Sequence, residues 1–395
     1  MVSFQEALGL LLENTLVVPT ERCRIEQAAG RILRETVVAD RPFPAFDRVM
    51  MDGFALRAAD WNAGCRNFRI TGASPAGKAA MILSPEAGTC LEVMTGAPCP
   101  TGAEMIIPVE EIVCRRADGV EFSDAADPVA GRFIHRAGSD AVQQEILLMP
   151  GCLLGSREIG VAASCGRGWL EVSTLPRITV VATGDELVAV DEFPEPHQIR
   201  QSNAHSLAAA LTAAGFQPSK ILSLCDDVEA ARLIIGEILV DVDWLILTGA
   251  VSKGIHDFIP TLLGELECRK VFHGVAQRPG KPIGFWLGPA GQRIVALPGN
   301  PVSALTGLHS MVMPALVAAA GGLPPFKRRV VLDDPSLQLP EFTRHLPVTF
   351  RPDGRVEPAP VGNSGDFIGL LKSDGFITLP PRGELSTAFP FTPWR

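Results

Sequence analysis

The sequence predicts a multidomain protein of the α/β plus β class, with a parallel-sheet α/β domain in the middle of the chain. Its 395 residues are enough for two or three domains of roughly 150 residues each. Apolar strand-like runs alternate with helical segments between Arg177 and Gly322, which is typical of a parallel sheet covered on both faces. On either side, short apolar runs separated by Gly and Pro indicate smaller β-rich modules.

The composition narrows the classes of function. Hydrophobic residues make up 47% and charged residues 20% of the chain, as in globular proteins with real cores. The net charge of −9 argues against a broad basic surface that would bind nucleic acid or an anionic membrane. A small anionic ligand remains compatible with this charge, because a few local cations suffice to hold it.

The cysteines and the N-terminus indicate the compartment. The nine cysteines include no C-x-x-C pair and no H-E-x-x-H motif occurs, so we expect reduced thiols rather than a zinc site or a disulfide framework. The first residues lack the features of a secretory signal, and no apolar run reaches the ~18 residues of a membrane-spanning helix. These features predict a cytoplasmic protein.

The N-terminal part of the chain changes character twice. An apolar i, i+3, i+4 rhythm predicts a helical segment from about Ser3 to Ile32. Prolines interrupt Asp40–Phe46 and indicate a linker. Short strands are then expected up to about Gly138, at Cys90–Met94, Met105–Val109 and Val120–Phe122 among others.

The central region supplies the α/β pattern. Strands are expected at Ile178–Ala182, Lys220–Leu224, Trp244–Leu247 and Ile294–Leu297. Helices are expected at 204–214 with Asn203 as the N-cap, at Val228–Val240, and from Pro301 onward. In such a domain the ligand binds at the carboxyl ends of the strands. Beyond Gly322 the short-strand pattern returns, which predicts a small C-terminal β-domain.

Two loops that follow expected strands combine small residues with polar groups. Thr183 through Leu187 offers a hydroxyl and two carboxylates, and Thr248 through Gly254 offers a hydroxyl and a cation shortly before Asp257. Small residues let the backbone approach an anion, and successive N–H groups can form an anion-binding nest. Taken alone, each loop is equally well explained as an ordinary strand-to-helix turn.

The stretch Leu297 through Ser303 is more informative. Asn300 is a suitable N-cap and Pro301 suits the first position of a helix, so free amides are expected there after a glycine turn. Upstream, Arg278 through Pro282 places two cations on a proline-stiffened turn, where they could pair with the oxygens of phosphate or a similar oxyanion. The competing interpretation is a solvated surface turn.

The N-terminal β-rich module contains three further polar stretches, each of which would be an ordinary turn if considered singly. They are Asp47 through Ala55, Met94 through Pro98, and Arg136 through Asp140. The seven histidines show no triad-like arrangement that could be defended from the sequence.

These stretches, in this order, resemble the MoeA family of molybdopterin molybdenumtransferases and the E domain of gephyrin along nearly the whole chain. The matching motifs are Met51 through Ala55, Met94 through Pro98, Arg136 through Asp140, Thr183 through Leu187, Asp226-Asp227, Ser252 through Asp257, Pro279 through Pro282, and Leu297 through Ser303. The turn Ser364-Gly365-Asp366 also looks like part of the family's last domain.

The resemblance implies a four-domain organisation and a homodimer. It implies a discontinuous linking domain (1–46 and 141–174), a β-rich lid (47–140), a MogA-like molybdopterin-binding α/β domain (175–323) and a C-terminal β-barrel-like domain (324–395). The site would be shared between subunits, with the α/β domain of one facing the lid of the other. A molybdopterin adenylyltransferase and molybdoenzymes would be further protein partners.

The resemblance also implies the reaction and its residues. Adenylylated molybdopterin and molybdate would give molybdenum cofactor and AMP, with Mg²⁺ assisting. The expected catalytic residues are Asp52, Asp140, Glu186, Asp227 and Asp257, of which Glu186, Asp227 and Asp257 would hold Mg²⁺. The expected substrate-binding residues are Thr95, Arg136, Thr183, Gly184, Gly249, Ser252, Lys253, Arg278, Lys281, Pro298, Gly299, Asn300, Pro301 and Ser303.

Two positions depart from the family pattern. Ala250 stands where most members have a second glycine, so a methyl group would narrow the approach of a ligand to the backbone. Phe54 stands where the family usually has tyrosine, which keeps the packing and loses a hydroxyl. Two other functions compete with molybdenum insertion. One is a non-catalytic molybdopterin-binding or scaffold role, and the other is the adenylyltransferase step, which would use only the α/β domain.

Overall fold

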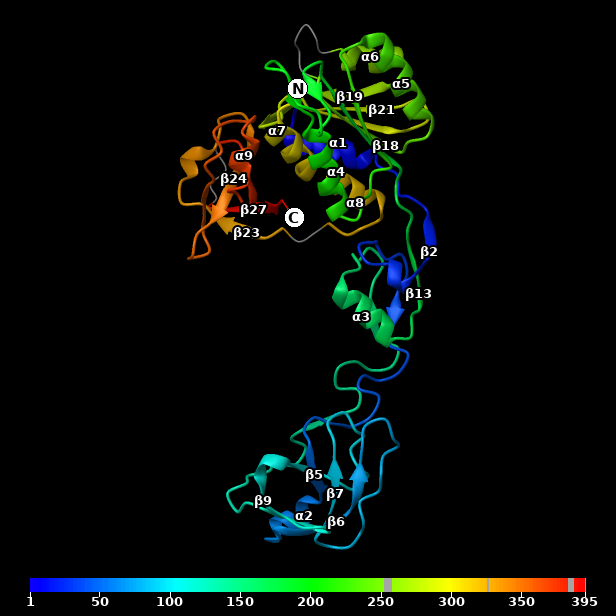
Figure 1. The fold of residues 1–395 in the computed structure, drawn as a ribbon, viewed down its shortest axis with the longest axis vertical. Coiled ribbons are helices and arrows are strands. Elements are labelled where there is room, and N and C mark those ends of the chain that lie inside the picture. Colours follow the sequence, from blue (N-terminus) through cyan, green and yellow to red (C-terminus); the bar gives the residue numbers. More distant parts are fainter. Residues whose placement is uncertain (252–257, 325–326, 383–386, 395) are drawn as a thin grey trace. The chain divides into compact units, whose positions relative to one another are not determined.

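The computed structural model describes residues 1–251, 258–324, 327–382 and 387–394. The chain forms two compact units. The first contains Met1–Glu35, Pro150–Ile159 and Trp169–Arg395, and the second contains Thr36–Met149 and Gly160–Gly168. Figure 1 shows the α/β and C-terminal parts of the first unit in green to red and most of the second unit in blue to cyan. Strands from 1–46 and 141–174 pair with each other, β2 (Thr20–Arg24) with β13 (Trp169–Ser173) and β3 (Val37–Val38) with β12 (Ile146–Leu148).

The centre of the first unit is a six-stranded sheet with the order β17-β14-β18-β22-β21-β19. Its parallel strands are β17 (Lys220–Leu224), β14 (Ile178–Thr183), β18 (Trp244–Thr248) and β22 (Arg293–Leu297). These are the strands predicted from the buried apolar runs, with bounds that agree within one residue. The sequence pattern did not reveal β19 (Arg269–His273) and β21 (Gly284–Leu287), which extend one edge in antiparallel fashion.

Helices cover both faces of this sheet. Alternate residues of β14 point to opposite sides, so that Val180 lies in one core and Val181 in the other. The core around Val180 includes α1 (Phe4–Glu13), α4 (Asn203–Ala213) and α7 (Pro301–Gly307). The opposite core includes α5 (Val228–Val240) and α6 (Ile259–Glu265). The structure therefore confirms a parallel-sheet α/β domain with both faces covered.

The helix that begins at Pro301 continues to Ala319 as a buried core helix. It passes through a π-helical turn (η3, Leu308–Val312) into α8 (Met313–Ala319). Pro301–Ala319 is long and apolar enough to span a membrane by length and composition alone, but 72% of this window is buried inside the molecule. Packing against the sheet accounts for its apolar character.

The predicted helix from Ser3 to Ile32 is wrong beyond its first part. Helix α1 begins with a reciprocal capping box between Ser3 and Glu6 and ends at Glu13. The following stretch carries two β-branched valines and Pro19, which lacks a backbone N–H, and it continues as the extended strand β2. The apolar rhythm therefore predicts the first ten residues of the helix correctly and does not predict where the helix ends.

The β structure predicted beyond Gly322 is present, and it recruits two strands from elsewhere in the chain. The sheet order is β1-β20-β24-β26-β27-β23, with β25 (Val356–Pro358) paired to β24. Strands β23 (Arg329–Val331), β24 (Thr343–Phe350), β26 (Gly375–Leu379) and β27 (Ala388–Pro393) come from the C-terminal part. Strands β1 (Val2–Ser3) and β20 (Val275–Arg278) join it from the N-terminus and the α/β region.

The second unit is built on another six-stranded sheet, β8-β5-β7-β6-β10-β9. Its strands are β5 (Gly53–Leu56), β6 (Asn67–Ser74), β7 (Thr89–Val93), β8 (Met105–Pro108), β9 (Ile112–Arg115) and β10 (Gly119–Phe122). Phe54 is fully buried and meets Phe122 edge-on, with ring centroids 5.6 Å apart. The phenylalanine therefore fills a core position, as expected for a residue that keeps the packing.

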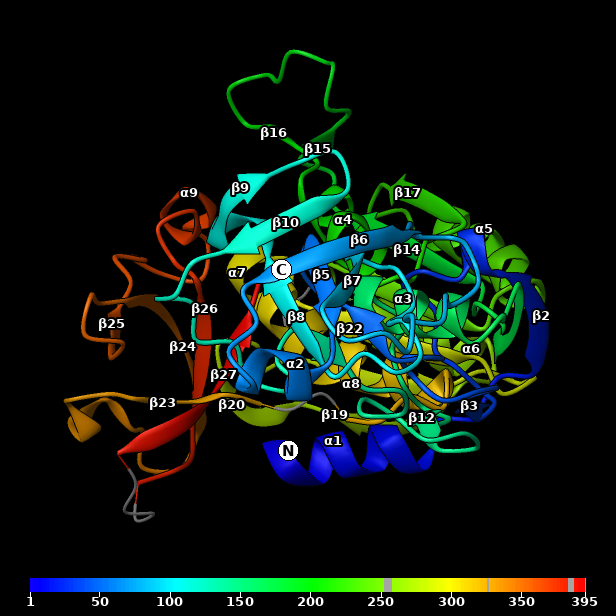
Figure 2. The same cartoon turned by 90° about the horizontal axis from the view of Figure 1, so that it is seen from below.

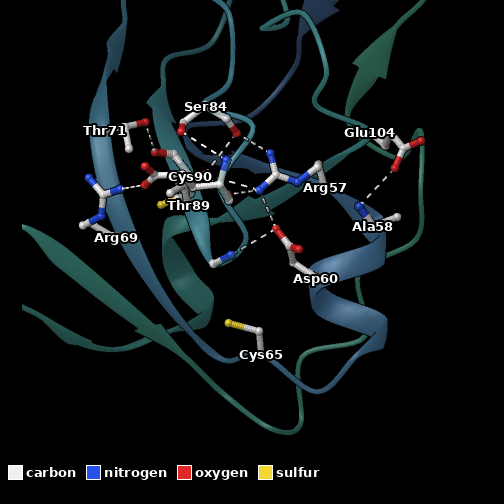
Figure 3. A network of polar contacts seen from close by, with 12 residues as sticks. Arg57, Ala58, Asp60, Cys65, Arg69, Thr71, Ser84, Thr89, Cys90 and Glu104 are labelled. Carbon is white, nitrogen blue, oxygen red and sulfur yellow. Dashed lines mark hydrogen bonds and ion pairs between the residues drawn. The ribbon is translucent and has the colours of Figure 1, made fainter.

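A polar network fixes the loop before β7 in this unit (Figure 3). The guanidinium of Arg57 donates to the carbonyl oxygens of Ser84 and Glu86 and pairs with Asp60 at 2.8 Å. The same Asp60 carboxylate accepts a hydrogen bond from the amide of Gly88. One partly buried arginine thus satisfies several backbone groups of the loop.

Candidate functional site

A cavity of about 700 Å³ lies at the carboxyl ends of the parallel strands in the first unit. Loops after β14, β18 and β22 form its walls, in the place where parallel-sheet proteins bind ligands. Its lining residues are Ala182, Thr183, Gly184, Glu186, Leu187, Ile199, Arg200, Gln201, Ser202, Asn203, Asp226, Thr248, Gly249, Ala250, Val251, Pro282, Pro298, Gly299, Asn300, Pro301, Gly365 and Phe367. The predicted residues Thr183, Gly184, Glu186, Gly249, Pro298, Gly299, Asn300 and Pro301 are brought together here.

The strand ends approach one another closely at Gly249. This residue has φ +99°, and a Cβ built on it would lie 2.3 Å from the carbonyl oxygen of Thr183, so a side chain is excluded. A Cβ on Gly299 would lie 3.6 Å from the Gly249 Cα, which places the ends of β18 and β22 in contact. The resulting floor is largely backbone, as a site for a bulky anionic ligand requires.

Among the residues that the structure describes, two carboxylates line the cavity. Glu186 lies over the neighbouring backbone, because a Cβ on Gly184 would lie 2.7 Å from its Oε2. Asp226 is the second, and its amide donates to Asp185 at 2.8 Å. The predicted ligand Asp227 is engaged elsewhere, because its Oδ1 accepts from the amides of Glu229 and Ala230 and caps α5.

Several predicted residues have a different status. Ser252, Lys253 and Asp257 lie outside the described residues. Ser303 is buried within α7 and does not line the cavity. Within the described ranges there is no group of three or more His, Cys, Asp or Glu side chains that could hold a metal ion.

The turn after β22 is held by side chains from two other elements. The Thr248 hydroxyl donates to the carbonyl oxygen of Pro298 at 2.9 Å. The Asn203 amide donates to the carbonyl oxygen of Gly299 at 2.6 Å and to the Thr248 hydroxyl at 3.3 Å. The prediction that Asn203 caps α4 is therefore wrong: Ser202 occupies the cap position, and Asn203 is the first helical residue, tying three loops together.

The C-terminal part of the chain contributes a wall that the predicted site lacked. Ser364 accepts from the side chain of Asn300 at 3.0 Å and, through its carbonyl, from the amide of Val302 at 3.1 Å. This contact brings Gly365 and Phe367 to the cavity. The Ser364-Gly365-Asp366 motif was the signal that could have located them.

The two predicted cations lie together, beside the cavity rather than on its lining. The guanidinium of Arg278 is 5.3 Å and the ammonium of Lys281 is 5.9 Å from the ring centroid of Phe342. Their neighbour Pro282 lines the cavity. The aromatic ring attracts both side chains by cation–π interaction.

Ala250 has φ +48°, a left-handed conformation that costs a residue with a Cβ about 1–2 kcal/mol. This backbone conformation favours glycine, the residue that most family members have at this position, so Ala250 departs from both the family pattern and the local backbone preference.

The predicted lid residues form close pairs within the second unit. Asp52 Oδ1 accepts from both the amide and the hydroxyl of Thr95, at 2.7 and 2.8 Å. These two hydrogen bonds, the amide's first, lower the pKa of Asp52. Arg136 pairs with Asp47, whose pKa is lowered mainly by a hydrogen bond from the amide of Ala137.

Asp140 is joined to a histidine that the sequence did not single out. His135 Nε2 lies 2.7 Å from Asp140 Oδ1, and this hydrogen bond is the largest cause that lowers the pKa of Asp140. The spacing of five residues gave no indication of the contact, because it depends on the turn between them.

The fold and the cavity define a multidomain α/β protein with a cavity at the carboxyl ends of a parallel sheet and with a second, β-rich unit. The model of the MoeA N-terminal region (domain I and II) matches residues 2–166, and that of a probable molybdopterin binding domain matches residues 179–318. The chain is 35% identical to a molybdopterin molybdenumtransferase of Synechocystis, over 94% of each chain. It is 36% identical to molybdopterin molybdenumtransferase 2 of Mycobacterium tuberculosis, over 83% of this chain and 82% of the relative.

A solved structure agrees. The molybdopterin biosynthesis MoeA protein of Pyrococcus horikoshii matches with a TM-score of 0.75 and 25% identity, over 99% of this chain and 98% of that one. The chain therefore belongs to the MoeA family of molybdopterin molybdenumtransferases, which confirms the resemblance of the sequence motifs.

Proposed function

We propose that this protein inserts molybdenum into adenylylated molybdopterin and releases AMP and molybdenum cofactor. The observation that carries the proposal is the similarity to named molybdopterin molybdenumtransferases over nearly the whole chain. The cavity suits the substrate, because a backbone floor at Gly249 and Gly299 admits a phosphoanhydride, while Arg278 and Lys281 lie on the turn that ends at the lining residue Pro282. Charge that develops on phosphate oxygens as this bond breaks would be stabilised by amides and cations.

The proposal includes Mg²⁺, held by Glu186 together with Asp226, Asp227 or Asp257. Glu186 and Asp226 supply oxygen ligands on the cavity wall, and oxygen donors without a cysteine cluster suit Mg²⁺ better than zinc. When bound, the ion would neutralise charge on the phosphate oxygens. We prefer Asp226 to Asp227 as the partner of Glu186, because Asp226 lines the cavity, whereas Oδ1 of Asp227 caps α5.

The proposal is tested by AMP release from adenylylated molybdopterin, measured with and without molybdate and Mg²⁺. AMP release that depends on molybdate and is coupled to cofactor formation would support the transferase. Tight pterin binding without AMP release would move the protein to the scaffold class. Formation of adenylylated molybdopterin from ATP would support the adenylyltransferase instead.

We also propose a cytoplasmic homodimer whose sites combine the lid residues of one subunit with the α/β residues of the other. Asp52→Ala and Glu186→Ala should each abolish cofactor formation while the dimer stays folded. If the sites are shared, re-dimerised mixtures of the two variants should regain about a quarter of wild-type activity, because half of the dimers then carry one intact site. Mixtures that stay inactive would contradict the shared site, and full activity of either variant alone would contradict the site assignment.

Glu92→Gln is the matched control for the lid variant. Glu92 lies on β7, next to strand β5, which begins directly after Asp52. Glu92 pairs with Arg115, so loss of the Glu92 carboxylate should leave AMP release unchanged. Equal losses in Glu92→Gln and Asp52→Ala would mean that the sheet, rather than Asp52, had been damaged.

A further inference from the structure

Three side chains of the second unit form a hydrogen-bonded chain that ends on Asp140. Strand β11 (Ile134–His135) pairs antiparallel with β4 (Arg48–Val49), and the register places His135 directly opposite Arg48. The Arg48 guanidinium lies 3.3 Å from His135 Nδ1, and His135 Nε2 lies 2.7 Å from Asp140 Oδ1. The imidazole therefore stands between a cation and a carboxylate.

The donor chemistry of arginine selects one form of this imidazole. A guanidinium only donates hydrogen bonds, so Nδ1 of His135 must accept the bond from Arg48 and carries no hydrogen. In the neutral ring the hydrogen then resides on Nε2, which donates to Asp140. The other tautomer would turn two N–H groups toward each other at Arg48 and a lone pair toward the carboxylate.

The carboxylate of Asp140 is held on one side only. Its Oδ1 accepts from His135 and, at 3.2 Å, from the hydroxyl of Ser139. Its amide donates to the carbonyl of Phe43 at 2.9 Å, which fixes the turn itself. The hydrogen bonds that the described residues make to this carboxylate all end on Oδ1, and the Asp140 side chain is 56% exposed, so these bonds leave Oδ2 unoccupied.

We propose that His135 is a positioning residue that, held by Arg48 in its Nε2–H tautomer, orients the carboxylate of Asp140 toward the substrate. The inference rests on the proposed function, since it gives Asp140 a place in the site. It adds that Arg48 on β4 holds the imidazole of His135, which in turn holds this carboxylate. His135 acts through Asp140 and does not touch the substrate.

The tautomer is tested without any activity measurement. Full-length protein labelled with ¹⁵N-histidine is studied by long-range ¹H–¹⁵N correlation about two pH units above the ordinary histidine pKa of ~6.5. His135 is assigned by comparison with His135→Gln. The Nε2–H pattern is expected in the wild type, and the double variant Arg48→Met/Asp140→Leu, which removes both partners of the ring, should give a mixture of both neutral tautomers. An Nδ1–H pattern in the wild type, or an unchanged pattern in the double variant, would overturn the proposal.

The positioning role is tested by AMP release in two variants. His135→Gln keeps a donor near the place of Nε2, whereas His135→Leu removes it. His135→Leu should lower kcat roughly 10- to 100-fold with little change in KM, as for a catalytic group displaced by about 1 Å. His135→Gln should recover most of that loss. Equal kcat in His135→Leu and wild type would contradict the role.

A control separates this result from failure of the fold or of the proposed function. His197→Leu removes an exposed histidine in the other unit and should leave kcat unchanged. If His135→Leu and His135→Gln lose kcat equally at an unchanged melting temperature, positioning through Nε2 is refuted. If the wild type itself lacks molybdate-dependent AMP release, the proposed function fails, while the tautomer measurement still decides whether His135 is held as proposed.

Discussion

At the scale of single residues, Ala250 is the clearest conflict between sequence and backbone. Its φ of +48° suits glycine, and the residue sits on the cavity lining directly after Gly249. Ala250→Gly should stabilise the α/β unit by about 0.5–1 kcal/mol, because relief of left-handed strain exceeds the entropy that glycine adds to the unfolded chain. Activity should stay the same or rise, as the approach to the backbone widens.

Urea unfolding that reports on the α/β unit measures this change. Ala209→Gly is the matched control: Ala209 lies on the exposed face of α4, where glycine should cost about 1 kcal/mol. The two substitutions are therefore expected to have opposite signs. A loss of stability in Ala250→Gly would show that the local backbone is adapted to alanine.

At the residue level, the predicted site residues agree with the cavity lining where a short motif carries the signal. Gly249 lies in a small-residue loop after a strand, Pro298 lies in a stretch that resembles the family motif, and both line the cavity. The choice between Asp226 and Asp227 could not be made, since it depends on which of two adjacent carboxylates caps α5. The partnership of His135 with Asp140 likewise required the turn between them.

At the scale of elements, Asn203 links the start of α4 to the loops after β18 and β22. Asn203→Ala removes the donor to the Gly299 carbonyl and frees the turn that forms the cavity floor. Because one neutral hydrogen bond stabilises by about 0.5–1.5 kcal/mol, we expect KM for adenylylated molybdopterin to rise roughly three- to tenfold. Steady-state kinetics with an unchanged melting temperature would support this role.

Asn62→Ala serves as the control for that change. Asn62 is exposed at the end of α2 (Ala58–Asn62) in the other unit, and its loss should leave KM unaltered. An unchanged KM in Asn203→Ala would mean that Thr248, which also holds Pro298, is sufficient to fix the turn.

The elements themselves were predicted with uneven success, for a physical reason. Strand β17 and helix α5 have the predicted bounds, because their apolar periodicity is strong and their ends are marked. The antiparallel strands β19 and β21 escaped the pattern for different reasons: β19, at the edge of the sheet, begins with two charged residues, and β21 is a run of only four residues that starts at Gly284. The helix predicted from Ser3 is too long, because the apolar rhythm does not show where the chain leaves the helix and pairs as strand β2 with β13.

At the scale of the whole molecule, the C-terminal part shares its core with the α/β region. Leu370, near the end of α9 (Phe367–Leu370), is buried in the same cluster as Leu305 and Leu308. Leu370→Ala should destabilise the first unit by about 2–5 kcal/mol. The loss should appear in the transition that reports on the central sheet, because both regions use one core.

The neighbouring leucine gives the control. Leu371 is 84% exposed, so Leu371→Ala should change stability by less than about 0.5 kcal/mol. Tryptophan fluorescence of Trp244 and Trp286, which are buried in the sheet, would follow the transition. If Leu370→Ala affected only signals from the C-terminal sheet, the two regions would have separate cores. The division into four domains remains a prediction.

The contact between Asn300 and Ser364 also has a consequence for the order of events during synthesis. These residues are 64 positions apart, and Gly365 and Phe367 follow the second of them. The parallel strands leave the ribosome long before these residues do, so a nascent chain can assemble its sheet while one wall of the cavity has yet to be made. The complete wall of the cavity is therefore expected only after residues 364–367 have been made.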